Sequence, residues 1–200
     1  MAQNRALFLD RDGVVNIDRG YVYRREDFVF RDGIFELANA AQALGYGLFI
    51  VTNQAGIARG YYSEADFLDL THWMIAEFRQ RQVSITNVYY CPYHPVHGRG
   101  RYRCDSPDRK PAPGMLFRAR SDFNLDLASS VLIGDQVSDM QAAVAAGVGT
   151  RIWIDMRREG LDPVPDCYVA ASLSEIQQKF FSDMGELRMA LTVGRSEKNS

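Results

Sequence analysis

The 200-residue sequence lacks a run of about 18 apolar residues, the length that a helix needs to cross a bilayer. Its first residues carry one short apolar stretch that stops at charged residues, so the pattern of a secretory signal peptide is also missing. Cysteine is scarce and odd in number, with three residues, which argues against a disulfide framework. We therefore expect a cytoplasmic protein with reduced thiols and no membrane partner.

An excess of basic residues is absent as well. Lys and Arg number 23 against 25 Asp and Glu, which leaves a formal net charge of −2. This balance creates no global positive field to attract nucleic acid or anionic lipid, although local basic patches remain open. A chain of this length can bury roughly 70% of its unfolded surface, so it needs no disulfide or structural metal to form a core. We expect one domain over residues 1–185 and a tail over 186–200.

Short apolar runs alternate with helical patterns along the chain. Strands are expected at residues 6–9, 48–51, 88–90, 131–133 and 151–154. Helices are expected over 34–44 before Gly45, after a cap at Ser63, and before Gly147. This alternation predicts an α/β fold with a parallel sheet and helices on both faces. The interval 91–110 has no period and predicts a long ordered loop.

Acidic residues follow two of the expected strands. Asp10 and Asp12 come directly after the first, where Gly13 permits a sharp turn, and Asp135 and Asp139 follow a later one. The carboxyl ends of parallel strands meet at one edge, where ligands bind. Carboxylates gathered there would repel one another unless a hard divalent cation neutralised them. The cation that prefers carboxylate and carbonyl oxygens is Mg²⁺.

The same edge offers groups for phosphate chemistry. Asp10 and Asp12, two positions apart, suit a nucleophile and a proton donor, although a D-x-D-G motif also occurs in ordinary turns. Thr52 and Asn53 end the second expected strand and can donate hydrogen bonds to phosphoryl oxygens. Cations follow at Arg109 and Lys110. Each residue alone is more often structural or solvated, but the combination favours a phosphate site.

Four motifs, at residues 8–13, 50–54, 109–111 and 134–139, resemble in this order those of the haloacid dehalogenase (HAD) superfamily of phosphatases. The resemblance extends from Phe8 to about Ile154 and implies a Rossmann-like, HAD-like parallel sheet. The resemblance also implies phosphoryl transfer to an aspartate with Mg²⁺ as cofactor.

The resemblance assigns roles position by position. Asp10 would be the nucleophile and an Mg²⁺ ligand, while Asp12 would protonate the leaving oxygen, activate water and give the metal its backbone carbonyl. Asp135 would be the other carboxylate ligand, and Asp139 would cap a helix or support the ligands. The transferring phosphoryl group would be held by Thr52, Asn53 and Lys110.

The intervals between the motifs leave no room for a sizeable cap domain, so we expect an open site bordered by loops. This resembles the capless branch that holds histidinol phosphatases and heptose bisphosphate phosphatases. Segments 8–22, 52–60 and 109–115 are most similar to the heptose 1,7-bisphosphate phosphatases. The implied partner is a small sugar bisphosphate that loses its 7-phosphate on a monomeric enzyme. The implied substrate contacts further include Asp18, Arg19, Gly20, Tyr21, Gln54, Arg59 and Arg109.

The sequence departs from that family in the 91–110 loop. Family members commonly bind a structural Zn²⁺ through C-x-H and then C-x-C before the R-K-P segment. Here Tyr93 holds the first histidine position, and the last cysteine position is lost in an altered segment. Two thiolates and two imidazoles could still bind Zn²⁺ at atypical spacing, namely those of Cys91, His94, His97 and Cys104. The alternative is a metal-free loop held by proline turns and tyrosine packing. Gln136 also replaces a lysine often seen in the family, which weakens one substrate contact.

Three other functions remain open. A histidinol-phosphate phosphatase belongs to the same branch. A nucleic-acid 3′-phosphatase is compatible with a capless site and a local basic patch at Arg99, Arg101, Arg103, Arg109 and Lys110. The acidic composition and the lack of a duplex-binding module argue against it, so no nucleic-acid partner is expected. A non-catalytic binding protein could share the fold, but the presence of both Asp10 and Asp12 argues against that.

Overall fold

The computed structural model describes residues 4–154 and 166–182. Their strands form one sheet in the order β3-β2-β1-β4-β5-β6, and all neighbouring strands are parallel. The strands are β1 (Ala6–Leu9), β2 (Gly47–Asn53), β3 (Ile85–Cys91), β4 (Val131–Gly134), β5 (Thr150–Ile154) and β6 (Tyr168–Ala170). The parallel α/β architecture expected from the sequence is confirmed, and all five expected strands are present.

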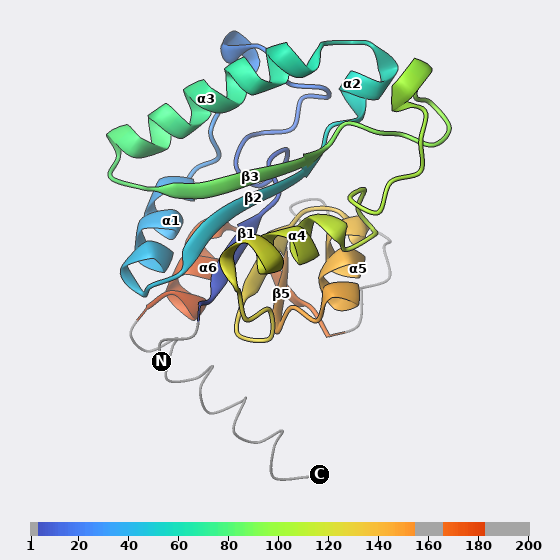
Figure 1. Ribbon diagram of the computed structural model, residues 1–200. Helices are drawn as coiled ribbons and strands as arrows, with labels where there is room; N and C mark the ends of the chain where they lie inside the picture. Colours follow the sequence, from blue (N-terminus) through green and yellow to red (C-terminus); the bar gives the residue numbers. More distant parts are fainter. Residues whose placement is uncertain (1–3, 155–165, 183–200) are drawn as a thin grey trace, which may run out of the picture.

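Helices cover both faces of the sheet (Figure 1). One face carries α1 (Ile34–Ala43), α3 (Glu64–Gln80) and α6 (Leu173–Phe180), and the other carries α4 (Gly114–Phe123) and α5 (Val137–Ala146). Alternate residues of β1 serve the two cores, because Leu7 and Leu9 face the first set of helices while Ala6 and Phe8 face the second. All four side chains are fully buried, which explains why the strand is a continuous apolar run.

The helix ends follow the local signals in the sequence. Ser63 caps α3 through a reciprocal pair of hydrogen bonds with Asp66. Gly45 and Gly147 follow α1 and α5 with positive φ angles of 83° and 75°, a conformation that costs glycine little. The apolar residues that recur at helical spacing in α3, namely Phe67, Leu70, Met74 and Phe78, are all buried.

Several elements were not predicted from the sequence. These are α2 (Ala55–Arg59), α4, α6 and the short edge strand β6. The 91–110 loop is irregular as expected, with one 3₁₀ turn at Gly100–Tyr102. Within residues 4–154 and 166–182 no cap domain interrupts the fold, and no helix is long and apolar enough to span a membrane. The expected boundary between domain and tail at residue 185 lies outside the described residues.

Candidate active site

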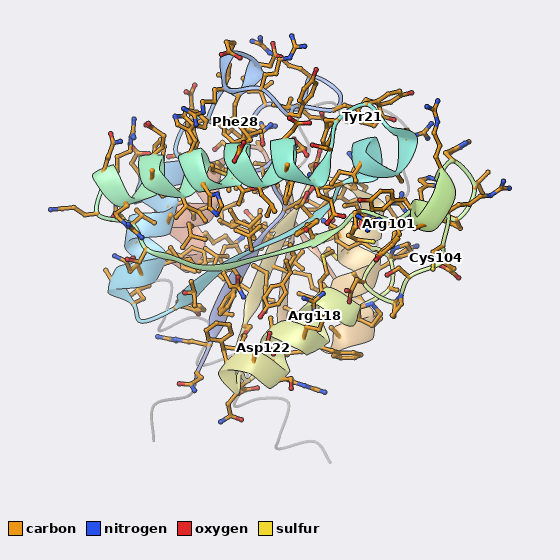
Figure 2. All side chains as sticks on the ribbon, turned by 45° about the horizontal axis from the view of Figure 1, so that its top comes forward. Tyr21, Phe28, Arg101, Cys104, Arg118 and Asp122 are labelled. Carbon is orange, nitrogen blue, oxygen red and sulfur yellow. The ribbon has the colours of Figure 1, made fainter. Side chains whose placement is uncertain are left out.

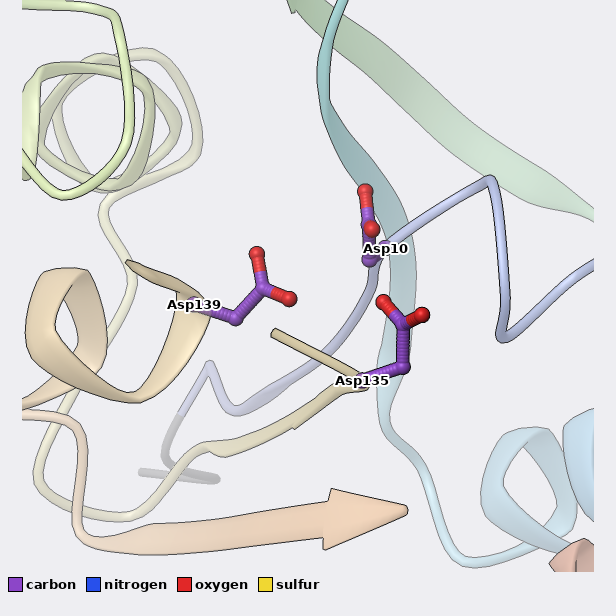
Figure 3. Close-up of side chains that lie close together, drawn as sticks. All are labelled: Asp10, Asp135 and Asp139. Atoms are coloured by element: carbon purple, nitrogen blue, oxygen red, sulfur yellow. The ribbon is translucent and has the colours of Figure 1, made fainter. Parts of the chain in front are cut away.

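Three carboxylates meet at the carboxyl ends of β1 and β4 (Figure 3). Asp10 follows β1, Asp135 follows β4, and Asp139 lies in the first turn of α5. One oxygen from each carboxylate lies within 4.8 Å of the others. The two strands are neighbours in the sheet, and the Asp10 N–H donates to the Ile133 carbonyl at 3.0 Å. The expected meeting of Asp10 and Asp135 is therefore a consequence of strand order.

Two glycines allow this close approach. Gly13 has a φ of +93°, and a Cβ there would lie 2.1 Å from Asp135 Oδ2. A Cβ on Gly134 would lie 2.3 Å from the Asp139 Cβ. A side chain at either position would push a carboxylate out of the cluster, so both glycines are required by sterics, and Gly13 is required by its backbone conformation as well.

Lys110 is the cation at the centre of this cluster, with only 5% of its surface exposed. Its Nζ lies 2.8 Å from Asp10 Oδ1 and 2.5 Å from Asp139 Oδ1, and it donates to the Val51 carbonyl at 2.8 Å. Asn53 holds the main chain of Lys110, since its amide donates to the Lys110 carbonyl at 2.9 Å and accepts from the Lys110 N–H at 3.0 Å. In this structure Asn53 therefore positions the lysine.

Burial dominates the electrostatics of the cluster. Burial raises the pKa of Asp10 well above its usual value, and the charges of Asp139 and Asp135 raise it further. Burial and the nearby Asp139 raise the pKa of Asp135 to about 6. Burial alone would lower the pKa of Lys110, but attraction to Asp10 and Asp139 outweighs it and raises that pKa. The one ammonium contacts two of the three carboxylates, so the cluster holds more acidic than basic groups.

This donor set fits a divalent cation. Asp135 Oδ1 is buried without a hydrogen-bond partner, an arrangement that is costly unless a cation binds it. Asp139 is already engaged, since one oxygen contacts Lys110 and the other accepts from the Gln136 N–H at 3.0 Å. These contacts match the expected capping role of Asp139 and leave Asp10 and Asp135 as the carboxylates available to a metal.

The Asp12 carboxylate is held by a different set of donors. The guanidinium of Arg11, almost fully buried, lies 2.7 Å from Asp12 Oδ2. Asn16 Nδ2 donates to Oδ1 at 3.1 Å, and Gln54 Nε2 donates to Oδ2 at 3.1 Å. The hydrogen-bond partners of Asp12 are thus different from those of Asp10, so the two carboxylates have different environments.

A pocket of about 380 Å³ lies against the carboxylates of Asp10, Asp12 and Asp139. Of the ten substrate contacts expected from the sequence, it is lined by Asp18, Gly20, Tyr21, Thr52, Asn53, Gln54 and Lys110. The Gly20 N–H donates to Asp18 Oδ1 at 2.8 Å, and both Gly20 and Tyr21 have positive φ angles. This turn brings Tyr21, labelled in Figure 2, to the pocket, with its ring centroid 4.7 Å from that of Tyr61.

The three expected arginine contacts are not among the residues that line this pocket. Arg19 is exposed on the turn before Gly20. Arg59 ends α2 and lies close enough to Arg109 for its charge to reinforce the effect of burial, which lowers the pKa of Arg109. The two guanidinium groups together form a positive region, and Arg109 directly precedes the pocket residue Lys110 in the chain.

Sequence reasoning missed Tyr62, which also lines the pocket. No clear signal in the sequence indicated it, because helix α2, which holds the neighbouring Gly56, was not predicted. A Cβ on Gly56 would lie 2.1 Å from the Tyr62 ring. The glycine therefore makes space for this tyrosine.

The four possible zinc ligands are not gathered in this structure. Cys91 is buried and faces the Tyr93 carbonyl, whereas Cys104 is exposed and contacts the carbonyl of Asp105. His94 Nδ1 accepts the backbone N–H groups of Val96 and His97. Among the described residues, the only group of three or more metal-binding side chains within reach of one another is that of Asp10, Asp135 and Asp139. The donor set at Cys91, His94, His97 and Cys104 does not fit tetrahedral Zn²⁺ in this arrangement.

Comparisons with known proteins agree with the site. A family model described as HAD-hydrolase-like matches residues 108–153. A D-glycero-alpha-D-manno-heptose-1,7-bisphosphate 7-phosphatase from Burkholderia mallei is 60% identical over 76% of this chain and 80% of its own length. The chain belongs to this family of HAD phosphatases. Another member, the D-glycero-beta-D-manno-heptose-1,7-bisphosphate 7-phosphatase of Vibrio cholerae, is 52% identical over 74% of this chain and 80% of its own length.

A solved structure of the family has the same fold. It is D,D-heptose 1,7-bisphosphate phosphatase from B. bronchiseptica, complexed with magnesium and phosphate. The two chains are 25% identical with a TM-score of 0.75, and the match covers 88% of this chain and 97% of that one. The HAD-like fold implied by the sequence motifs is thereby confirmed.

Proposed function

We propose that this protein is a Mg²⁺-dependent phosphatase that removes the 7-phosphate of D-glycero-D-manno-heptose 1,7-bisphosphate. The observation that carries the proposal is the buried contact of Lys110 with Asp10 beside an unpartnered oxygen of Asp135. This is the arrangement that attack by a carboxylate on a phosphoryl group requires, because the anionic group must be received among neutralised charges. The substrate follows from the names of relatives up to 60% identical.

In the first step, an oxygen of Asp10 attacks phosphorus while the bond between phosphorus and the sugar oxygen breaks. Asp12 gives its proton to the leaving sugar oxygen. Lys110 offsets the negative charge on the transferring group, and the Thr52 hydroxyl donates a hydrogen bond to it.

In the second step, Asp12 takes a proton from water, and the water oxygen forms a bond to phosphorus. The bond between phosphorus and Asp10 breaks, which releases phosphate and regenerates the carboxylate. A bound Mg²⁺, held by Asp10, Asp135 and the Asp12 carbonyl, would supply neutralising charge at this site.

The second phosphate of the substrate would bind near Arg59 and Arg109. Guanidinium groups bind phosphate in a bidentate manner, which supplies binding energy for orienting the other phosphate. Histidinol phosphate carries a cationic amine instead, so the same positive region should repel it. A preference for a second phosphate over an amine therefore distinguishes the proposed heptose bisphosphatase from a histidinol phosphatase.

A substrate panel tests the proposal. It contains both anomers of the heptose bisphosphate, histidinol phosphate and an oligonucleotide with a 3′-phosphate. We expect kcat/KM for the preferred heptose anomer to exceed that for histidinol phosphate by at least about tenfold, or roughly 1.4 kcal/mol. Arg59→Ala should reduce this preference, and Arg79→Ala, an exposed arginine of α3, should leave it unchanged. Equal efficiencies would favour histidinol phosphatase, and a preference for the oligonucleotide would favour a nucleic-acid 3′-phosphatase.

We further propose that one chain is sufficient for activity, because the cluster at Asp10 and the residues that line its pocket come from the same chain. Light scattering at assay concentrations should give the mass of a monomer, 22.6 kDa. A larger mass together with activity that falls on dilution would contradict this.

A further inference from the structure

A buried hydrogen-bond network connects Tyr62 to Asp12 through the side-chain amide of Gln54. Gln54 Nε2 donates to Asp12 Oδ2 at 3.1 Å and to Thr52 Oγ1 at 2.9 Å. Gln54 Oε1 accepts the Tyr62 hydroxyl at 2.5 Å. Gln54 is only 1% exposed, and these contacts use both of its N–H groups. Its side chain is thus committed to protein groups, although the sequence indicated a substrate contact.

Packing fixes the hydroxyl of Tyr62. The ring stacks on Tyr23 with centroids 5.0 Å apart and planes inclined by 11°, and it packs in a cluster with Ile57 and Phe67. Gly56 leaves the space that the ring fills. Burial raises the pKa of Tyr62, so its hydroxyl stays protonated and serves as a donor.

This donor determines which end of the Gln54 amide faces Asp12. An amide has a donor end and an acceptor end, and the Tyr62 hydroxyl at one end requires the carbonyl oxygen there. The NH₂ group must then point to Asp12 and Thr52. If the amide turned over, its oxygen would face the Asp12 carboxylate, and an attraction would become a repulsion.

The amide also orients Thr52. Since Thr52 Oγ1 accepts a hydrogen bond from Gln54, its own hydrogen is free to point to another acceptor. Thr52 lines the pocket, where a phosphoryl oxygen would be that acceptor. Arg11 and Asn16 also hold Asp12, but of these three donors Gln54 is the one whose hydrogen bonds reach both Asp12 and Thr52.

We propose that Tyr62 and Gln54 are positioning residues, which orient the Asp12 carboxylate for proton transfer and the Thr52 hydroxyl for phosphoryl binding. The inference rests on the roles proposed above for Asp12 and Thr52. It assigns to Tyr62, a residue at the junction of α2 and α3, an effect on proton transfer through two hydrogen bonds.

The leaving group separates this role from a merely structural one. A sugar oxygen must be protonated as it leaves, whereas p-nitrophenolate is stable as an anion and needs no acid. For both esters kcat/KM reports the steps up to transfer of the phosphoryl group to Asp10. We expect Tyr62→Phe to lower kcat/KM for the sugar phosphate about tenfold, which is a part of the usual general-acid contribution. For p-nitrophenyl phosphate we expect a loss of less than about twofold, because only the orientation of Thr52, which serves both esters, is then impaired. Gln54→Met should show the same pattern.

Tyr89→Phe is the matched control. Tyr89 is also buried and also loses a hydroxyl hydrogen bond, to Asp122, but it belongs to the core on the α4 side of the sheet. We expect it to change both efficiencies by the same small factor. Melting temperatures of all variants monitor folding.

A double-mutant cycle with Asp12→Asn gives the second readout. If Tyr62 acts through Asp12, adding Tyr62→Phe to Asp12→Asn should lower the sugar phosphate rate by less than about twofold. An equal loss for both esters, or a tenfold loss that persists in the Asp12→Asn background, would overturn the proposal.

A wild-type protein that hydrolyses other sugar phosphates but no heptose bisphosphate would contradict the proposed substrate alone. The same double-mutant cycle would then be measured with the sugar phosphate that the protein accepts. Inactivity toward all of these esters would overturn both proposals.

Discussion

Lys110 Nζ donates a hydrogen bond of 2.8 Å to Asp10 Oδ1, although the two residues are 100 positions apart in the chain. Both residues are largely buried, with 7% of Asp10 and 5% of Lys110 exposed, so water solvates neither charge fully. A buried ion pair contributes little net stability, but removal of one partner leaves the other charge unpaired. The pair therefore keeps the Asp10 carboxylate in place at the end of β1, and the position of that carboxylate depends strongly on Lys110.

We expect Asp10→Asn to abolish turnover. An amide cannot accept the phosphoryl group as a carboxylate does, and the substitution also removes a charged metal ligand. Steady-state rates with the sugar bisphosphate measure the loss, and circular dichroism checks that the variant folds. A folded variant with more than about a tenth of the wild-type rate would contradict attack by Asp10, because lost nucleophilic catalysis costs far more.

Lys110→Met should destabilise the protein as well as inactivate it. The buried Asp10 and Asp139 would lose their shared cation, and breaking such a pair costs about 3–5 kcal/mol. Urea denaturation in a chelator measures the change in the free energy of unfolding. Arg118→Met is the control, because Arg118 pairs with Asp108 at the surface with 54% of its side chain exposed, and such pairs contribute about 0–1 kcal/mol. Similar losses for the two variants would contradict a buried pair at Lys110.

The stability of the metal-free protein should fall as pH rises through about 6. Burial raises the pKa of Asp135 from 3.8 to about 6, and it raises the pKa of Asp10 as well. Between these values the folded state holds more protons than the unfolded state, so increasing pH favours unfolding.

Added Mg²⁺ should reverse this trend, because the cation binds the deprotonated carboxylates and stabilises the folded state most above about pH 6. Melting temperatures from about pH 5 to 8, with chelator and with Mg²⁺, measure both effects. Asp135→Asn should flatten the metal-free curve. A curve for this variant that matches the wild type would show that other groups cause the dependence.

The purified protein should contain far less than about one zinc per chain, since its Cys and His side chains are not arranged for a tetrahedral site. Elemental analysis measures the content. Cys104→Ser should change neither the content nor the melting temperature, because the Cys104 thiol is exposed. About one zinc per chain in the wild type, lost in Cys104→Ser, would show that the loop rearranges around a metal.

Local patterns in the sequence were sufficient to predict much of the fold. The strands, the caps at Ser63 and Gly147 and the positions of the acids depend on neighbouring residues, through apolar runs, hydrogen-bonding side chains and permitted φ angles. Strand β6 and helix α6 were missed. The three residues of β6 are too few to make a periodic pattern.

The sequence by itself determined that Asp10 and Asp135 would meet, because residues after parallel strands share one edge of the sheet. Only the tertiary structure decided how the remaining groups are paired. It joined Lys110 to Asp10 and Asp139, committed Gln54 to Asp12 and Tyr62, and left Cys91 buried and Cys104 exposed. These pairings depend on the packing of side chains that are distant in the chain, and neither periodicity nor motif spacing contains that information.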